Sequence, residues 1–301
     1  MKPIKDSIIV FGGLARDCAC NLARNLNEIE KIRTKVKKLY ICILENDSSD
    51  NTPEVMDNFC SCHDNVIVKH FKETHYDVSS TTGASMSRIC RLTKYRNMLL
   101  ENMQSYCGNS DFFVIIDWDL DEFDSTQVLK AIENAPSDWG AIFANGRYKW
   151  QFKENRQTGF RDKNKIYDSF AILEDGMSIE SIQKDDNSIY NRFVIARKFG
   201  FLLNKYRYVK CTSAFGGIGI YKSKCLEGCS YSTMKKGDWY ICEHLAFNYT
   251  IRENGYQNYI CSLLKTSIIL KQNNRFSYLF NKYLPIVHDY LLFLLLKIKN
   301  H

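Results

Sequence analysis

The densest group of reactive side chains in the sequence is an acidic run that directly follows an apolar segment. Carboxylates this close together repel one another unless a cation or a proton lies among them. Their oxygen atoms suit Mg²⁺ or Mn²⁺, ions that keep several water ligands and also bind substrate phosphates. The run therefore predicts a divalent metal site, and the alternative is a solvated acidic turn. Five carboxylates fall within eight positions: Asp117, Asp119, Asp121, Glu122 and Asp124.

A second polar run, residues 45–52, also follows an apolar segment. Asp47, Ser48 and Asp50 are residue types that favour turns and helix caps, and we expect Asp50 to cap a helix that begins near Pro53. Glu45 differs from them because it stands at the end of the apolar segment. From that position it could accept hydrogen bonds from a nucleotide base or from ribose hydroxyls.

The elements that must position these residues alternate between strand and helix through the first half of the chain. Residues 111–116 form an almost continuous apolar run, which is typical of a central parallel strand buried on both faces. The alternation predicts an α/β fold with a mixed, mostly parallel sheet flanked by helices, and ligands at the carboxyl ends of its strands. Strands are expected at 7–11, 38–44, 65–70, 111–116 and 139–144, and helices at 17–37, 52–59, 87–103 and 126–134.

The second half of the chain is more irregular. We expect a loop over 153–165, a helix over 185–205, a glycine-rich strand over 215–221 and a helix over 239–253. Because no linker separates the two halves, we expect one continuous catalytic domain over residues 1–264.

Residues 265–301 differ in character from the rest, since they carry six basic side chains and one acidic side chain. The uninterrupted apolar stretch 290–296 is far shorter than the ~20 residues that span a bilayer. This extension is expected to be helical. It fits an interfacial anchor on an anionic membrane, with packing on the body or an oligomer contact as the alternative.

The composition is that of an ordinary globular chain. Of 301 residues, 45% are hydrophobic and 25% charged, which excludes disordered and fibrous classes. The net charge of +7 and the pI of 8.7 fall short of the pI above about 9 of nucleic-acid-binding domains, so we expect no nucleic-acid partner. The twelve cysteines lack paired zinc spacing, and we expect the short apolar run near the N-terminus to be a strand and not a secretory signal. We therefore expect free thiols in a cytoplasmic protein, peripheral on the membrane if the extension binds it.

Several blocks of the sequence together resemble GT-A-fold glycosyltransferases, which use nucleotide sugars. The run ENDSSDNT (45–52) resembles the turn after their second strand, and IIDWDLDEF (115–123) resembles their D-x-D motif. Further blocks resemble a subgroup related to CAP59-type capsule mannosyltransferases. The blocks extend from about residue 8 to residue 248, and their order and spacing carry the resemblance: Arg96-Asn97, Asn145-Gly146, Tyr167-Asp168, FGGIGIYK (215–222) and Cys242-Glu243-His244.

The resemblance implies a metal-dependent hexosyl transfer from a UDP- or GDP-sugar to a glycan or lipid-linked acceptor, in the synthesis of a surface polysaccharide or glycoconjugate. Glu45 and Asp47 would hold the nucleotide base, and Arg96 would bind the base or the diphosphate. Asp117 would contact the ribose or the metal, and Asp119 would bind the metal that bridges the phosphates. The acidic run allows two overlapping D-x-D pairs, so Asp121 is a further candidate ligand.

The resemblance also implies residues beside the sugar. Asp168, Glu243 and His244 would lie near it, and Gly216 and Gly217 would let the backbone approach it closely. An inverting enzyme needs a carboxylate that deprotonates the acceptor hydroxyl, and Glu243 is the candidate for that base. His244 is a candidate further ligand of Mn²⁺ or Mg²⁺.

Two other functions fit parts of the same pattern. A magnesium-dependent nucleotidyltransferase could use the acidic run, although the phosphate-binding sequence G-x4-G-K-[ST] is absent. A catalytically inactive protein of the same fold could bind glycans or act as a scaffold. Such a protein would show no metal-dependent nucleotide binding.

Overall fold

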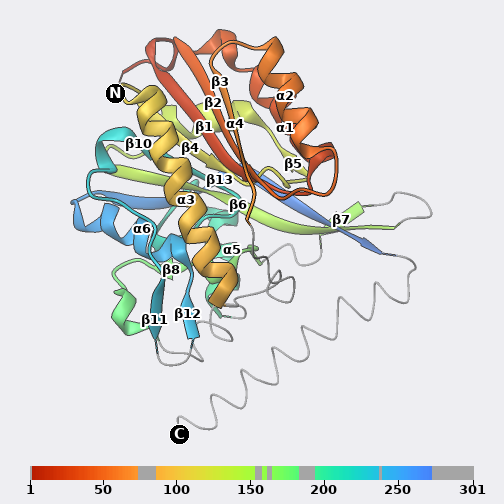
Figure 1. Cartoon of the computed structure of the whole chain (residues 1–301). Coiled ribbons are helices and arrows are strands. Elements are labelled where there is room, and N and C mark those ends of the chain that lie inside the picture. The colour runs from red at the N-terminus through yellow and green to blue at the C-terminus, as the bar shows by residue number, and fades with distance from the viewer. Residues whose placement is uncertain are drawn as a thin grey trace, which may run out of the picture.

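The computed structural model describes residues 2–73, 86–152, 158–160, 165–182, 194–236 and 239–272. In these parts of the chain an eleven-stranded sheet carries helices on both faces, and a short hairpin stands apart from it (Figure 1). The predicted α/β class is therefore confirmed. The helices are α1 (Ala19–Glu30), α2 (Thr52–Cys62), α3 (Met86–Cys107), α4 (Ser125–Glu133), α5 (Ala196–Lys205) and α6 (Glu243–Glu253).

The strands of the main sheet follow the order β3-β2-β1-β4-β10-β6-β13-β9-β8, with β5 beside β13 and β7 beside β6, and β11 pairs with β12. Their bounds are β1 (Ile8–Ala15), β2 (Lys38–Asn46), β3 (Val66–Phe71), β4 (Phe112–Ile116), β5 (Glu122–Phe123), β6 (Trp139–Phe152), β7 (Thr158–Phe160), β8 (Leu173–Glu174), β9 (Tyr208–Ser213), β10 (Ile218–Lys222), β11 (Met234–Lys236), β12 (Trp239–Ile241) and β13 (Gln257–Gln272).

The directions of the long strands explain where a ligand site can form. Strands β3, β2, β1 and β4 are parallel, and β6 is parallel to β13. Strand β10 runs antiparallel between β4 and β6, so β4 and β6 point the same way. The carboxyl ends of β1, β2 and β4 and the start of β10 therefore lie at one edge of the sheet, where α/β folds bind ligands.

Two apolar cores hold the helices on the two faces of the sheet. One core contains Leu99 and Met103 of α3 together with side chains of α5 and α6. The other contains Leu22 and Leu26 of α1 together with side chains of α2 and α4. All five residues of β4 are buried, which confirms the sequence interpretation of that strand as one covered on both faces.

Gly13 of β1 allows the end of β4 to approach closely. A Cβ atom at this position would lie 2.2 Å from the carbonyl oxygen of Ile116 and 2.6 Å from Nε1 of Trp118. Since neither a backbone carbonyl nor a fully buried indole can move away freely, only glycine fits there. This contact fixes the segment that begins the acidic run.

Several predicted elements differ from the structure. Residues 239–241 form β12 and not helix, so α6 begins only at Glu243. The helix expected over 17–37 is divided into α1 and a 3-10 helix at Arg33–Lys35. The expected loop 153–165 contains β7, while residues 153–157 and 161–164 lie outside the described residues. Of the helix expected over 185–205, residues 185–193 also lie outside the described residues, and α5 covers Ala196–Lys205.

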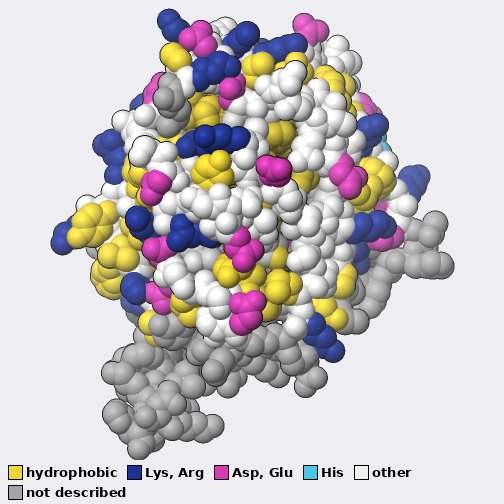
Figure 2. Space-filling model, turned by 90° about the vertical axis from the view of Figure 1, so that its left-hand side faces the viewer, with side chains coloured by type: hydrophobic (Ala, Val, Ile, Leu, Met, Phe, Trp, Pro, Cys, Tyr) yellow, Lys and Arg dark blue, Asp and Glu magenta, His cyan; other side chains and the backbone are white. Residues whose placement is uncertain are grey.

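The expected boundary between residues 264 and 265 falls inside β13, whose later residues pair with β6 from Lys265 to Gln272. Those residues therefore belong to the sheet, and residues 273–301 of the expected extension lie outside the described part. No helix in the described part is both long and apolar enough to cross a membrane. On the face around α6 and β10, basic and acidic side chains are interspersed and are not separated by sign (Figure 2).

Candidate active site

A pocket of about 270 Å³ opens at the carboxyl edge of the sheet, between the ends of β1, β2 and β4 and helix α3. Its charged lining consists of four arginines and two aspartates, so its formal charge is positive. Arginine forks match phosphate and carboxylate oxygens in pairs, and a pocket of this sign therefore suits an anionic ligand. The charged lining residues are Arg16, Arg88, Arg91, Arg96, Asp117 and Asp119.

The acidic run reaches this pocket because its side chains alternate. Trp118 and Leu120 are fully buried in the core, whereas Asp119 is exposed and Asp117 is partly exposed. Asn25 of α1 donates from Nδ2 to the carbonyl oxygens of both buried residues, at 3.0 and 2.9 Å. This hydrogen bonding fixes the backbone, and Asp117 and Asp119 consequently line the pocket.

The other three carboxylates of the run hold the chain in place. Asp121 accepts a hydrogen bond from the backbone N–H of Ile269 at 2.5 Å, and Glu122 accepts one from the Ser267 hydroxyl at 2.5 Å. Asp124 caps α4 by accepting from the N–H of Thr126 at 2.9 Å. Asp121, a predicted metal ligand, is therefore engaged by β13 and is not among the residues that line the pocket.

Arg96 joins three elements at the base of the pocket. Its Nε donates to Oε1 of Glu243 at 3.0 Å, and its Nη2 lies 3.5 Å from Oδ1 of Asp117. The guanidinium also lies over the rings of Phe215 and Tyr231, at 5.3 and 5.9 Å from their centroids. Arg96 is 7% exposed and Glu243 is 3% exposed, so this is a buried ion pair between α3 and α6. Its stability depends on both partners being present.

Asp168 lies beside this ion pair in a strained backbone conformation. Its φ is +59°, and its Oδ2 accepts a hydrogen bond from the N–H of Gly216 at 3.3 Å. Burial and the neighbouring charge of Asp117 raise the pKa of Asp168 to about 7. Burial also raises the pKa of Asp117, with the charges of Asp119 and Glu243 adding to the effect and Arg96 opposing it. Carboxyl groups of this kind gather at functional sites.

Gly216 and Gly217 both have positive φ, +64° and +84°. A Cβ atom on Gly217 would lie 2.4 Å from the hydroxyl oxygen of Tyr167, and one on Gly146 would lie 2.3 Å from the ring of the same tyrosine. The glycines therefore make room for Tyr167 next to Asp168. The sequence predicts that this backbone approaches the donor sugar, and in the structure Gly217 lies next to Tyr167.

His244 is buried with no polar contact in the described part of the chain. Its ring stacks on Phe215 with centroids 4.0 Å apart, and neither ring nitrogen has a hydrogen-bond partner there. Burial lowers its pKa well below the ordinary value, with Arg96 adding to the effect, so the imidazole is neutral. Buried polar atoms without partners are uncommon and call for a ligand or a water. Among the described residues, however, no three His, Cys, Asp or Glu side chains lie close enough to hold a metal together.

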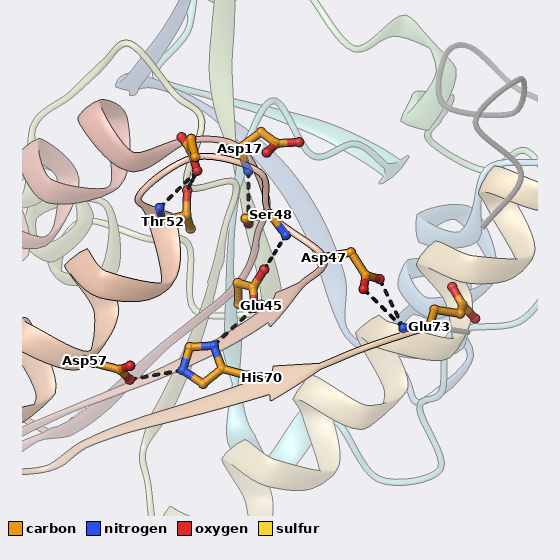
Figure 3. A network of polar contacts seen from close by, with 9 residues as sticks. Asp17, Glu45, Asp47, Ser48, Thr52, Asp57, His70 and Glu73 are labelled. Atoms are coloured by element: carbon orange, nitrogen blue, oxygen red, sulfur yellow. Dashed lines mark hydrogen bonds and ion pairs between the residues drawn. The ribbon is translucent and has the colours of Figure 1, made fainter. Parts of the chain in front are cut away.

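Glu45 and Asp47 stabilise the loop after β2 (Figure 3). Glu45 is 4% exposed, and its carboxylate accepts from the N–H of Ser48 at 2.7 Å and contacts Nδ1 of His70 at 3.1 Å. The other ring nitrogen of His70 lies 3.0 Å from Asp57. Asp47 accepts from the N–H of Glu73 at 3.2 Å. Neither carboxylate lines the pocket, which the loop reaches through Asn46 instead.

Asp50 has the capping role that the sequence predicts. Its carboxylate accepts from the N–H groups of Thr52 and Ala19, the first residues of α2 and α1, each at 3.0 Å. Sequence reasoning missed Asn46, Arg88 and Arg91 as pocket residues. The i, i+3 spacing of the two arginines, which places both on one side of a helix, is the signal that could have identified them.

The structure of this chain is similar to three solved structures of other proteins. The chain is similar to the mannosyltransferase PcManGT from Pyrobaculum calidifontis in complex with GDP-Man and Mn²⁺ (13% identity, TM-score 0.48, 88% of this chain and 58% of that chain). It is similar to S. aureus TarS 1-349 (11%, 0.45, 87% and 60%) and to mannosyl-3-phosphoglycerate synthase from Rubrobacter xylanophilus (13%, 0.40, 94% and 72%). The chain thus spans less than two thirds of the first two proteins.

No protein-family model matches the chain, and no curated protein matches it. Because these structural likenesses are distant, residue roles rest on the geometry of this chain.

We expect the substitution Arg96→Met to destabilise the protein by about 3–5 kcal/mol, because it leaves the Glu243 carboxylate buried without a charged partner. Urea unfolding measures the loss. The double variant Arg96→Met/Glu243→Leu should recover much of it, since no buried charge then remains at position 243. Lys94→Met is the matched control on the same helix, where an exposed pair with Glu73 contributes only about 0–1 kcal/mol. Equal losses for Arg96→Met and Lys94→Met would contradict the prediction.

The contacts of His70 predict a pH-dependent stability. Burial lowers the pKa of His70, but the hydrogen bonds to Asp57 and Glu45 raise it by more, so the net shift is upward. A raised folded-state pKa stabilises the fold at a pH below the unfolded-state pKa, and the effect disappears as pH rises through the folded-state pKa. His70→Gln should therefore lower the unfolding free energy more at acidic than at alkaline pH. His63→Gln is the control, and the same difference in both variants would refute the assignment to His70.

Proposed function

We propose that this chain is a metal-dependent glycosyltransferase that binds a nucleoside-diphosphate sugar in the pocket between β1, β2 and β4. The observation that carries the proposal is that four arginines and two aspartates line one pocket, with the partly buried carboxylate of Asp168 and the buried carboxylate of Glu243 close to Arg96. The charged lining of the pocket would bind the anionic diphosphate. The sugar, whose bond to that diphosphate must break, would lie beside Asp168 and Glu243. The resemblance of the sequence blocks to GT-A enzymes supports the same conclusion.

Asp117 and Asp119 fit a divalent ion. Mg²⁺ and Mn²⁺ are commonly bound by one or two carboxylates plus substrate phosphates and water, so two carboxylates in a pocket for a diphosphate suffice. Burial raises the pKa of both aspartates, and repulsion from neighbouring carboxylates adds to the shift while Arg96 opposes it. The sequence also suggests His244 as a ligand, but no three such side chains of the described residues lie close enough to share an ion, so we propose Asp117 and Asp119 alone. When bound, the ion acts as a Lewis acid that stabilises the departing diphosphate.

The arginines and the loop after β2 would bind the nucleotide. Arg88, Arg91 and Arg96 project from α3 toward the strand ends and supply the charge that a diphosphate needs. Asn46 lines the pocket at the end of β2, and we assign it to the base because its side-chain amide can both donate and accept hydrogen bonds. Glu45 and Asp47, the residues that the sequence predicts at the base, then act by holding the loop that carries Asn46.

For an inverting transfer we assign the proton-accepting role to Asp168. Glu243 is the base that the sequence predicts, but Arg96 occupies one of its oxygens and the Cys242 thiol, at 3.7 Å, contacts the other. Asp168 has a raised pKa near neutrality, which suits a general base. Glu243 would act as a positioning residue that holds Arg96 toward the diphosphate.

The acceptor and the location follow the sequence expectations. We propose that a hexosyl group is transferred to a glycan or a lipid-linked acceptor in the synthesis of a surface polysaccharide or glycoconjugate. Residues 273–301, with their basic and apolar composition, would hold the enzyme against the cytoplasmic face of a membrane.

The metal and donor roles are tested by thermal unfolding with UDP-, GDP-, CDP- and ADP-sugars, each with and without Mn²⁺. One nucleotide class should stabilise the protein only with the metal, by ~2.7 kcal/mol at 100 times its dissociation constant. Asp119→Asn should remove both this shift and turnover while the free protein keeps its stability. Asp64→Asn, an exposed turn residue, is the control. A panel without any shift would favour a glycan-binding scaffold.

The role of Asp168 predicts a pH profile. A general base must be deprotonated, so kcat/KM should rise as pH increases through about 7, the raised pKa of this group. Asp168→Asn should lower kcat by about 10²–10⁴-fold and abolish that rise. Glu243→Gln should weaken donor binding and keep the rise. If instead the rise vanishes in Glu243→Gln and persists in Asp168→Asn, the two roles are reversed.

A further inference from the structure

Tyr167 is held in place by two glycines beside the carboxylates of the candidate site. A Cβ atom on Gly146 would lie 2.3 Å from two carbons of its ring, and one on Gly217 would lie 2.4 Å from its hydroxyl oxygen. Neither position can hold a larger residue while the ring stays where it is. The backbone N–H of Tyr167 also donates to the carbonyl oxygen of Gly146 at 3.0 Å, and the ring of Tyr148 contacts its ring with centroids 5.3 Å apart. The position of the tyrosine is therefore closely fixed.

The turn at Gly216 and Gly217 places this tyrosine between two carboxylates of the proposed reaction. The carbonyl oxygen of Gly217 accepts a hydrogen bond from the N–H of Asp117 at 2.9 Å, and the N–H of Gly216 donates to Asp168 at 3.3 Å. Burial raises the pKa of Tyr167, and the negative charges of Asp117 and Asp168 add to the shift. The hydroxyl group therefore lies near both carboxylates and keeps its proton.

The hydroxyl group of Tyr167 is available to a ligand. It forms no hydrogen bond within the described parts of the chain, although tyrosine hydroxyls with little access to water usually have a partner. The hydroxyls of Tyr95 and Tyr208, for comparison, donate to Glu73 and to the carbonyl oxygen of Ala131. Tyr167 is partly exposed, and its oxygen is not one of the fully enclosed side-chain atoms without a partner, so a ligand can reach it.

The charges around Tyr167 indicate what kind of group it binds. The carboxylates of Asp117, Asp168 and Asp119 all act on its hydroxyl, and they repel an anion that no cation accompanies. A neutral hydroxyl group is not repelled, because it can donate to a carboxylate while it accepts from the phenol. A hexose presents several such hydroxyl groups, and in a nucleotide sugar it is joined directly to the diphosphate. The surroundings of Tyr167 therefore favour the sugar over the phosphates.

We infer that Tyr167 binds the donor sugar through a hydrogen bond between its phenol and a sugar hydroxyl, and that it thereby recognises the sugar part of the donor and not the nucleotide part. The inference rests on the proposed function, because it assigns a residue within the donor site. Gly217, which the resemblance places against the sugar, then acts by making room for the tyrosine that contacts it.

Calorimetric titration of the full chain with Mn²⁺ present tests the inference. The probes are UDP-glucose, UDP-N-acetylglucosamine, GDP-mannose, CDP-glucose and ADP-glucose, each compared with the nucleoside diphosphate that it contains. Tyr167→Phe removes the hydroxyl and keeps the ring. This variant should bind the sugar nucleotide about tenfold more weakly, as expected for the loss of one hydrogen bond, and the nucleoside diphosphate within about twofold of the unaltered protein. Equal losses for both ligands, or no loss for either, overturn the inference.

Tyr249→Phe is the matched control. Tyr249 lies on α6, is partly exposed like Tyr167 and does not line the pocket between β1, β2 and β4, so its variant should bind both kinds of ligand normally. Both variants should also keep the urea midpoint of the unaltered protein, because the Tyr167 hydroxyl holds no described part of the fold. A lower midpoint in Tyr167→Phe alone, or weaker sugar-nucleotide binding in both variants, overturns the inference.

The nucleoside diphosphates separate this inference from the proposed function. If the unaltered protein binds one of them with Mn²⁺, and Tyr167→Phe binds the matching sugar nucleotide as tightly as the unaltered protein does, the inference alone fails. If the unaltered protein binds none of the nucleoside diphosphates or sugar nucleotides, the proposed function fails and the inference fails with it.

Discussion

The buried ion pair between Arg96 and Glu243 is the interaction on which the rest of the site depends. It joins residues 147 positions apart in the chain and so fixes α3 against the start of α6. Removing two charges from water is unfavourable, and only good geometry with further contacts offsets it. Here those contacts are the rings of Phe215 and Tyr231 and the neighbouring Asp117. The pair thus holds the guanidinium of Arg96 in a fixed position at the base of the pocket between β1, β2 and β4.

The acidic run shows how one stretch of sequence serves two purposes. Burial of Trp118 and Leu120 turns Asp117 and Asp119 outward into a pocket, while the carboxylates that follow bind backbone and side chains of β13 and α4. Five negative charges so close together would repel one another if they shared one cavity. Division of the run between a ligand site and structural contacts reduces that repulsion.

The sequence predicted the α/β alternation well, because the long apolar runs of β2 and β4 and the helical periodicity of α1 and α3 are strong local signals. It did not predict β9 and β13, because their mixed polar and apolar residues give no clear strand pattern without their partner strands. In the site, Asp117, Asp119, Arg96 and Glu243 do come together. The sequence could not predict the orientation of Glu45, because its carboxylate binds Ser48 in the following turn and His70 in the neighbouring strand.

The position of β13 in the chain has a consequence for synthesis. Domains form as the chain emerges from the N-terminus onward, and β1 through β4 are complete long before residue 257 is made. The backbone N–H of Ile269 and the hydroxyl of Ser267 hold Asp121 and Glu122, so the acidic run gains its last contacts only when β13 docks. A nascent chain on the ribosome can therefore form the first strands of the sheet, but the acidic run is not fixed until nearly all the described chain has been translated.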